Sequence, residues 1–328
     1  MSRSYWKNRN VLVTGANGFL GSWISKRLVE EGANVICFIR DALPKSFFQL
    51  SGTVDKVVIA HGALEDYFSV ERVLNEFEVD FCFHLAAQAI VGTAERFPLS
   101  TYESNIRGTW NVLEGVRRNS RVQGLVLASS DKVYGSKEKL PYTEREALGG
   151  VNPYDVSKVC ADLLAQSYFH TYGIPVGIAR SGNFYGPGDL NFSRIVPGTI
   201  RSLISNQEPV IRSDGTYLRD YFYVEDAAAA FLTLGENLHK DSIKGQAFNF
   251  GTEAPTQVIE VVRQLIELSG NKHLKPVILN QAVHEIKAQY LSCRKARELL
   301  GWKHTTDLKK GLAKSYSWYR EFFAAESP

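Results

Sequence analysis

Five side chains with complementary chemistry fall in two short runs of the sequence. Ser130, Asp131 and Lys132 are consecutive, and Tyr154 and Lys158 follow later, four positions apart. A free tyrosine titrates near pH 10, which is too high for a base at neutral pH. A neighbouring ammonium and a cationic ring favour the phenolate, so a Tyr/Lys pair suits removal of a proton from an alcohol.

The elements around these runs would bring them together. The apolar run Gly124–Ala128 predicts a buried strand of a parallel sheet. The serine, aspartate and lysine then lie at its carboxyl end, where open α/β sheets bind ligands. Pro153–Tyr172 has a helical pattern, so Tyr154 and Lys158 share one helix face. We therefore expect one cleft to hold both runs.

A glycine-rich turn opens the chain after the apolar run Val11–Thr14. Its spacing is G-x-x-G-x-x-G, and a helical pattern follows. Glycines let the backbone approach a pyrophosphate, and the helix N-terminus supplies N–H groups to it. This setting predicts dinucleotide binding, and the alternative is a tight structural turn. The cofactor-binding residues expected here are Gly15, Asn17, Gly18, Phe19, Leu20 and Gly21.

The cofactor's adenosine end should meet the next strand, Asn34–Ile39, which is followed by Arg40 and Asp41. An acid at this position bonds the ribose, whereas an arginine can hold a 2′-phosphate. We expect NAD, with NADP kept open by Arg40, which could also be a solvated loop charge. Further cofactor contacts are expected from Leu64, Leu85, Ala86, Ala87, Gln88 and Asn105, and from Tyr154 and Lys158. His84 lies inside an apolar run and is interpreted as a core histidine.

Strands and helices alternate through residue 180, which predicts an α/β fold with a doubly wound parallel (Rossmann) sheet. From about Ser181 the elements become shorter and the turns more frequent. We expect residues 1–180 to form a dinucleotide-binding domain. Residues 181–328 would form a smaller C-terminal α/β lobe that binds substrate and is partly interleaved with the first domain.

Composition excludes several classes of function. The formal net charge is only +3, from 38 basic and 35 acidic residues, which does not favour nucleic acid or a membrane surface as partner. The four cysteines lack metal-ligand spacing, so no metal is expected. The start has no apolar signal core and no run could span a bilayer, which predicts a cytoplasmic location. The helical stretch 93–118 has an apolar face, for core packing or for a homodimer interface with the Tyr154 helix.

The motifs together resemble the extended short-chain dehydrogenase/reductases that act on nucleotide sugars, over essentially the whole length. The resemblance rests on the glycine turn, His84–Gln88, the strand-end serine, Tyr154-x-x-x-Lys158, the Asn183 loop and Arg219-Asp220-Tyr221. Epimerases of that family usually have small or neutral residues after the serine, and 4,6-dehydratases an acid pair. Ser130-Asp131-Lys132 most resembles the CDP-glucose 4,6-dehydratases, in which Ser-Asp-Lys replaces the acid pair.

The resemblance implies a three-step reaction that yields a 4-keto-6-deoxy sugar. Ser130 and Tyr154 bind the C4 hydroxyl, which is oxidised, while Lys158 holds the nicotinamide ribose. The new ketone acidifies C5, and water leaves across C5 and C6. Asp131 is expected as the acid, and Lys132 as the base or as a charge that steadies the enolate. Lys132 could also be a plain salt-bridge partner of Asp131. The hydride finally returns to C6.

A nucleotide-diphosphate sugar also needs polar and cationic contacts. The substrate-binding residues expected are Gln88, Ser130, Asn183, Arg194, Arg212 and Arg219, and His284-Glu285 for the nucleoside. The chain is shorter than expected for CDP-glucose dehydratases, and its Arg219-Asp220-Tyr221 form is closer to epimerases and other dehydratases. The nucleotide therefore stays open.

Two other functions remain open at this point. One is an NDP-sugar 4-epimerase or a UDP-glucuronate epimerase or decarboxylase, against which the Asp131-Lys132 pair argues. The other is a module that senses dinucleotides without catalysis, against which the complete set of Ser130, Tyr154 and Lys158 argues.

Overall fold

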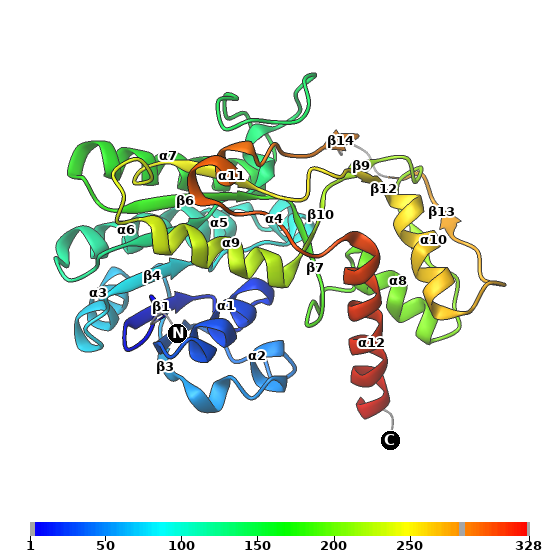
Figure 1. Ribbon diagram of the computed structural model, residues 1–328, viewed down its shortest axis with the longest axis horizontal. Helices are drawn as coiled ribbons and strands as arrows, with labels where there is room; N and C mark the ends of the chain where they lie inside the picture. The colour runs from blue at the N-terminus through cyan, green and yellow to red at the C-terminus, as the bar shows by residue number, and fades with distance from the viewer. Residues whose placement is uncertain (1–3, 282–285, 327–328) are drawn as a thin grey trace.

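A parallel sheet forms the centre of the computed structural model, which describes residues 4–281 and 286–326. Within these residues the sheet has seven strands in the order β11-β6-β5-β4-β1-β2-β3 (Figure 1). The predicted doubly wound fold is confirmed. The strands are β1 Asn10–Thr14, β2 Asn34–Ile39, β3 Val58–His61, β4 Phe81–His84, β5 Leu125–Ala128, β6 Val176–Ser181 and β11 Ala247–Phe250.

Helices cover both faces of the sheet because its strands are apolar on both sides. Residues Val11 and Val13 of β1 pack with α1 (Phe19–Glu30) and α9 (Val224–Asn237). Leu12 points to the other face. There it joins the cluster of α3, α6 and α7, which span Tyr67–Glu76, Gly108–Arg118 and Pro153–Tyr172. The remaining flanking helices are α2 Phe47–Leu50, α4 Val91–Arg96, α5 Pro98–Tyr102 and α11 Arg294–Leu300.

The helical stretch expected over 93–118 is divided. It consists of α4, α5, a π-helical turn (Glu103–Arg107) and α6. The strand expected over 80–88 ends at His84, because the Thr14 hydroxyl accepts the N–H groups of Leu85 and Ala86. These amides are thereby withdrawn from strand pairing, and the segment that follows is free to turn along the sheet edge.

The second half of the chain builds a lobe beside the sheet, drawn on the right of Figure 1. Its helices are α8 Ile195–Ile204, α10 Val258–Ser269 and α12 Leu308–Glu326, which share one apolar cluster. Its short strands are β7 Asn183–Tyr185 with β10 Tyr221–Tyr223, β8 Val210–Ile211 with β13 Val277–Ile278, and β12 Thr256–Gln257 with β9 Leu218–Arg219 and β14 Ala288–Gln289. Strand β7 lies where we expected only a loop. Since α9 and β11 belong to the sheet layers, chain segments alternate between the two regions, and the division at residue 180 stays a prediction.

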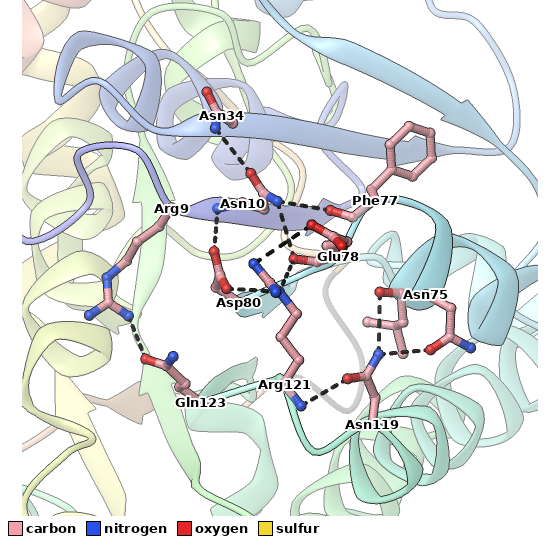
Figure 2. A network of polar contacts seen from close by, with 11 residues as sticks. Arg9, Asn10, Asn34, Asn75, Phe77, Glu78, Asp80, Asn119, Arg121 and Gln123 are labelled. Atoms are coloured by element: carbon pink, nitrogen blue, oxygen red, sulfur yellow. Dashed lines mark hydrogen bonds and ion pairs between the residues drawn. The ribbon is translucent and has the colours of Figure 1, made fainter.

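Polar side chains close the amino edge of the sheet (Figure 2). The Asn10 main-chain N–H donates to Asp80 Oδ2 (2.8 Å), and Asn10 Nδ2 donates to the Phe77 carbonyl (3.1 Å). Arg121 Nε lies 3.1 Å from Asp80 Oδ1. The polar groups at this amino edge bond one another. We therefore look for the ligand site at the opposite, carboxyl edge of the sheet. In the part of the chain that the structure describes, no helix combines the length and apolarity needed to cross a bilayer.

Candidate active site

A 3-10 helix, Asp131–Tyr134, begins directly after β5 and gathers the first run of predicted residues. Ser130 Oγ accepts from the Lys132 main-chain N–H (3.2 Å) and donates to Asp131 Oδ1 (3.1 Å). Lys132 Nζ lies 3.4 Å from Asp131 Oδ2, and the Asp131 side chain is buried. The three groups therefore form one compact turn at the carboxyl end of the strand.

A buried ion pair supports this strand end. Arg180 on β6 donates from Nε and Nη2 to the Asp162 carboxylate of α7, at 2.9 and 2.8 Å. Both residues are almost fully buried, with exposed fractions of 3% and 0%. Ser129 Oγ donates to the same carboxylate (2.7 Å). Because Ser129 precedes Ser130, this network holds the start of the turn that carries Ser130, Asp131 and Lys132.

Helix α7 brings the second run to the same place. Pro153 occupies its first turn, where a missing N–H costs nothing. Lys158 Nζ donates to the main-chain carbonyl of Ala128 (2.8 Å), the last residue of β5. Burial lowers the pKa of Lys158 to about 8, against the opposing charge of Asp162. The lysine therefore fastens α7 to the strand end that carries Ser130.

The sequence predicts that the two runs share one cleft, and Tyr154 does meet Ser130 through a side-chain hydrogen bond. Burial raises the pKa of Tyr154 to about 12, and the Ser130 bond and the Arg194 charge only partly oppose it. The lowering expected from the sequence requires an ammonium and a cationic ring together, and in the protein alone desolvation decides the direction. A cation beside the phenol is still needed to make it a base at neutral pH.

The glycine turn has the close backbone packing that a dinucleotide site requires. Gly15 has a φ of +68°, and a Cβ there would lie 2.8 Å from Ala86 Cα. A Cβ on Gly21 would lie 2.1 Å from the Gly15 carbonyl oxygen. Gly18 is the N-cap of α1 and offers no capping side chain, so the N–H groups of Phe19 and Leu20 are left to a ligand. These features fit a nicotinamide dinucleotide.

The end of β2 presents charged groups next to this turn. Asn17 Nδ2 donates to the Asp41 carbonyl (2.6 Å) and so joins the turn to β2. The Arg40 guanidinium bonds the Asp41 carboxylate (2.7 Å) and lies 3.9 Å from Glu65 Oε1. One cation is therefore shared by two carboxylates.

The segment after β4 is held from behind. Asn105 is buried and bonds the main-chain N–H and carbonyl of Gln88 (2.6 and 3.1 Å) and Ser157 Oγ (2.9 Å). Gln88 Oε1 accepts from the Ile90 N–H (3.1 Å). Asn105 thus shapes Leu85–Gln88, the segment in which Ala86 and Ala87 carry only small side chains. Leu64 is buried over Gly108.

His84 lies beneath this segment. Its Nδ1 and Nε2 lie 2.9 and 3.0 Å from the hydroxyls of Thr14 and Thr109. Burial lowers its pKa to about 3. The interpretation of His84 as a core histidine is confirmed.

Two polar side chains of the lobe lie on the paired strands β7 and β10. Asn183 on β7 is in register with Tyr221 on β10. Among the described residues, Asn183 Nδ2 and the Tyr221 hydroxyl are buried without a hydrogen-bond partner. A buried donor without a partner is costly, so a ligand that accepts a hydrogen bond would repair the deficit. Arg219 on β9 donates to the Leu218 carbonyl (2.9 Å) and stacks over Tyr217.

Comparisons with known proteins agree with this geometry. The profile of the family described as GDP-mannose 4,6 dehydratase matches residues 12–315. The chain belongs to this family. Its membership confirms the predicted resemblance to extended short-chain dehydrogenase/reductases that act on nucleotide sugars, and the chain is an enzyme of this dehydratase and epimerase group.

Individual relatives cover nearly the whole chain. CDP-glucose 4,6-dehydratase of Salmonella typhimurium is 29% identical over 99% of this chain and 94% of its own length. The structure of UDP-glucose 4-epimerase from Thermotoga maritima with UDP-glucose has a TM-score of 0.87 at 27% identity, covering 96% and 99% of the two chains. That of dTDP-glucose 4,6-dehydratase from Streptomyces venezuelae with NAD bound has a TM-score of 0.85 at 25% identity, covering 96% and 98%.

Some of the residues predicted to bind substrate do not lie beside Ser130 and Tyr154, or are bonded to other groups. Arg194 Nη1 bonds both carboxylate oxygens of the buried Asp189, each at 3.0 Å, although its charge still reaches Tyr154. Arg212 is exposed and follows β8, a strand of a different small sheet from the one that holds Arg219. His284 and Glu285 lie outside the described residues.

Three residues that the sequence reading missed belong to the site. Asp162 and Arg180 form the ion pair described above. Gln289 is fully buried, accepts from Lys132 Nζ and donates to the Asp131 main-chain carbonyl (2.9 Å). Asp162 could have been found from the sequence, because it lies four residues after Lys158 and therefore on the same face of the helix. The strand of Gln289 is too short to show any periodicity.

Proposed function

We propose that the chain is an NDP-sugar 4,6-dehydratase, with CDP-glucose as the expected substrate and a 4-keto-6-deoxy sugar as product. The observation that carries the proposal is the Asp131 and Lys132 pair beside Ser130, which is itself bonded to Tyr154. A 4-epimerase needs groups only for oxidation and reduction at C4. The additional acid–base pair is what an elimination at C5 and C6 requires.

The residues would act in the order of the reaction. Ser130 and Tyr154 bind the C4 hydroxyl, and Tyr154 takes its proton. Bound NAD would supply the hydride chemistry, by which the C4 hydride is removed and later returned to C6. Of Asp131 and Lys132, one takes the C5 proton and the other protonates the departing C6 hydroxyl. Lys158 orients the nicotinamide ribose, and its charge beside a cationic ring favours the Tyr154 phenolate.

We propose NAD rather than NADP. Asp41 and Glu65 together outweigh the charge of Arg40, so a 2′-phosphate would meet a net negative site. Asp41 can bond the ribose hydroxyls that NAD leaves free. The dTDP-glucose 4,6-dehydratase with a similar fold was crystallised with NAD, which supports this choice.

The sugar nucleotide would lie between the sheet edge and the lobe. We propose that Asn183 Nδ2 donates to the diphosphate and that Arg219 neutralises it. Cytidine as the base rests on the Ser-Asp-Lys sequence and on the relative that acts on CDP-glucose. The division into a dinucleotide domain (1–180) and a substrate lobe (181–328) remains part of this proposal, with α9 and β11 returning to the sheet.

The Asp131→Asn variant tests the elimination chemistry. The variant should still oxidise C4 and reduce the cofactor, but water should not leave. The C4 ketone that still carries its C6 hydroxyl should therefore accumulate. Glu138→Gln, which changes an exposed carboxylate in the following loop, is the matched control and should leave turnover unchanged. Full water loss by Asp131→Asn would remove the basis of the proposal.

The second candidate is a 4-epimerase, favoured by the fold similarity to the Thermotoga enzyme. It predicts an isomerised sugar nucleotide of unchanged mass. In that case Asp131→Asn would leave the product's composition unaltered.

We also propose a homodimer through helices α5, α6 and α7. Leu99, Trp110 and Leu163 on these helices are exposed, with fractions of 73%, 43% and 51%. Light scattering should give twice the chain mass, and Trp110→Glu should halve it. A wild-type monomer at micromolar concentration would contradict the dimer. Cytoplasmic location stays a prediction.

A further inference from the structure

We propose that Gln289 is a positioning residue for the elimination step. It holds Lys132 as a proton donor beside Asp131, so that Lys132 protonates the departing C6 hydroxyl and Asp131 takes the C5 proton. The inference rests on the proposed dehydratase function. It reverses the order of roles expected from the sequence, in which Asp131 was the acid.

The side chain of Gln289 makes two different bonds to the catalytic turn. Its Nε2 donates to the Asp131 main-chain carbonyl (2.9 Å), and its Oε1 accepts from Lys132 Nζ. The residue is fully buried, with an exposed fraction of 0%. Among the described residues of the lobe, Gln289 alone hydrogen-bonds the side chain of Asp131 or Lys132.

The first bond fixes the direction of the second. A main-chain carbonyl can only accept, so the amide nitrogen of Gln289 must face Asp131 and the amide oxygen must face Lys132. Lys132 Nζ also approaches Asp131 Oδ2 (3.4 Å), which is a second acceptor. An amine that faces two acceptors donates its hydrogens to both. An ammonium has three hydrogens, so after donating to both acceptors Lys132 keeps one for a ligand in the cleft and has no lone pair with which to act as a base.

The proton balance then closes without a further reactant. The Asp131 carboxylate forms a bond to the C5 proton, and the C5–H electron pair moves into the enolate of the C4 ketone. The enolate pair then forms the C5=C6 double bond and restores the C4 ketone, while the C6–O bond breaks and the Lys132 ammonium gives its proton to the leaving oxygen, which departs as water. The Lys132 side chain is 21% exposed, so it can reach a ligand in the cleft.

The place of Gln289 in the fold links this step to substrate binding. Gln289 on β14 is paired in register with Arg219 on β9. The same small sheet therefore presents an arginine toward the proposed diphosphate site and a glutamine toward the catalytic lysine. Binding the diphosphate would fix both strands, and binding energy away from the sugar would help to orient Lys132.

The test compares two substitutions in the full chain. Gln289→Met removes both bonds at nearly the same length, whereas Gln289→Glu keeps an acceptor for Lys132. In a single turnover with CDP-glucose, we expect Gln289→Met to slow water loss about 10- to 100-fold, the usual effect of losing a hydrogen bond to a charged group. C4 oxidation, followed by cofactor absorbance, and the KM should stay within about twofold, because Gln289 does not touch C4.

Gln289→Glu should recover most of the lost rate. Gln257→Met, on the exposed strand β12 of the same sheet, is the matched control and should behave as wild type. Equal slowing of oxidation and water loss in Gln289→Met, or unchanged water loss, would overturn the inference.

A second measurement does not depend on turnover. Lys132 should be acetylated by acetic anhydride several times faster in Gln289→Met than in wild type, measured by peptide mass spectrometry at one pH. Equal rates would overturn the inference even if the enzyme dehydrates its substrate. If wild type isomerises the sugar without losing water, the proposed function fails separately, and the elimination roles fall with it.

Discussion

Replacing Arg180 with methionine should destabilise the protein far more than a change at an exposed ion pair. Arg180 and Asp162 are buried, and two of the guanidinium's bonds go to the carboxylate. A third goes to the Tyr134 hydroxyl (3.0 Å). Methionine would leave Asp162 charged and buried, with only Ser129 and Gln166 as donors, each at 2.7 Å.

The expected magnitude follows from burial. Removing one partner of a buried pair costs about 3–5 kcal/mol. Since two donors to Asp162 remain, we expect the lower end, about 3 kcal/mol. For a chain of 328 residues the entropy of unfolding is about 0.7 kcal/mol per kelvin, so the Tm should fall by about 4 °C.

Calorimetry and urea titration measure this effect. The double variant Arg180→Met/Asp162→Asn should regain at least half of the loss, because no buried charge is left. Arg27→Met, which removes an exposed partner of Glu31, should leave the Tm unchanged. An Arg180→Met protein with a Tm within about 1 °C of wild type would refute the reasoning.

Three further changes test other parts of the site. Tyr154→Phe should reduce C4 oxidation about 1,000-fold without weakening NAD binding, measured by stopped-flow absorbance and by protein fluorescence, because only the base is lost. Asp155→Asn should stabilise the protein above pH 6, by about 1–2 kcal/mol in urea titrations. Burial raises the pKa of Asp155 from 3.8 to about 6, so the native state resists an ionisation that the unfolded chain accepts, and the penalty is absent below pH 4. The double variant Asp41→Ser/Glu65→Gln should raise the affinity for NADP relative to NAD at least tenfold, measured by calorimetric titration, because Arg40 is released for a 2′-phosphate.

Each change has a contrary result. If Tyr154→Phe oxidised C4 at the wild-type rate, another group than Tyr154 would have to take the proton of the C4 hydroxyl. A stability difference for Asp155→Asn that is equal at pH 4 and pH 8 would show that its carboxyl is not perturbed by burial. An unaltered preference for NAD in the double variant would place the discrimination outside the end of β2.

The sequence predicted those parts of the site that depend on local patterns. The strand, glycine turn and helix of the first thirty residues form one continuous signal, and the Pro153–Tyr172 helix has the predicted bounds. Because α7 and the end of β5 meet at one edge in any doubly wound sheet, the meeting of Ser130 with Tyr154 also followed.

What remained hidden depends on contacts between distant segments. Gln289 lies 158 residues from the Asp131 carbonyl that it binds, on a two-residue strand with no periodic pattern. The paired Asn183 and Tyr221 strands are three residues each and stand in a turn-rich region. Burial raises the pKa of Tyr154 in the protein alone, which the sequence does not show, since motif spacing gives the neighbours of a group but not how far it is desolvated.

The most direct test of the proposed function is incubation of the purified protein with CDP-, dTDP-, GDP- and UDP-hexoses, followed by mass spectrometry. We predict that CDP-glucose loses one water and that the other sugar nucleotides persist. Water loss from another nucleotide sugar would keep the mechanism and change the substrate. A product of unchanged mass with an inverted C4, and no water loss from any substrate, would contradict the dehydratase assignment and leave Asp131 and Lys132 without a role in elimination.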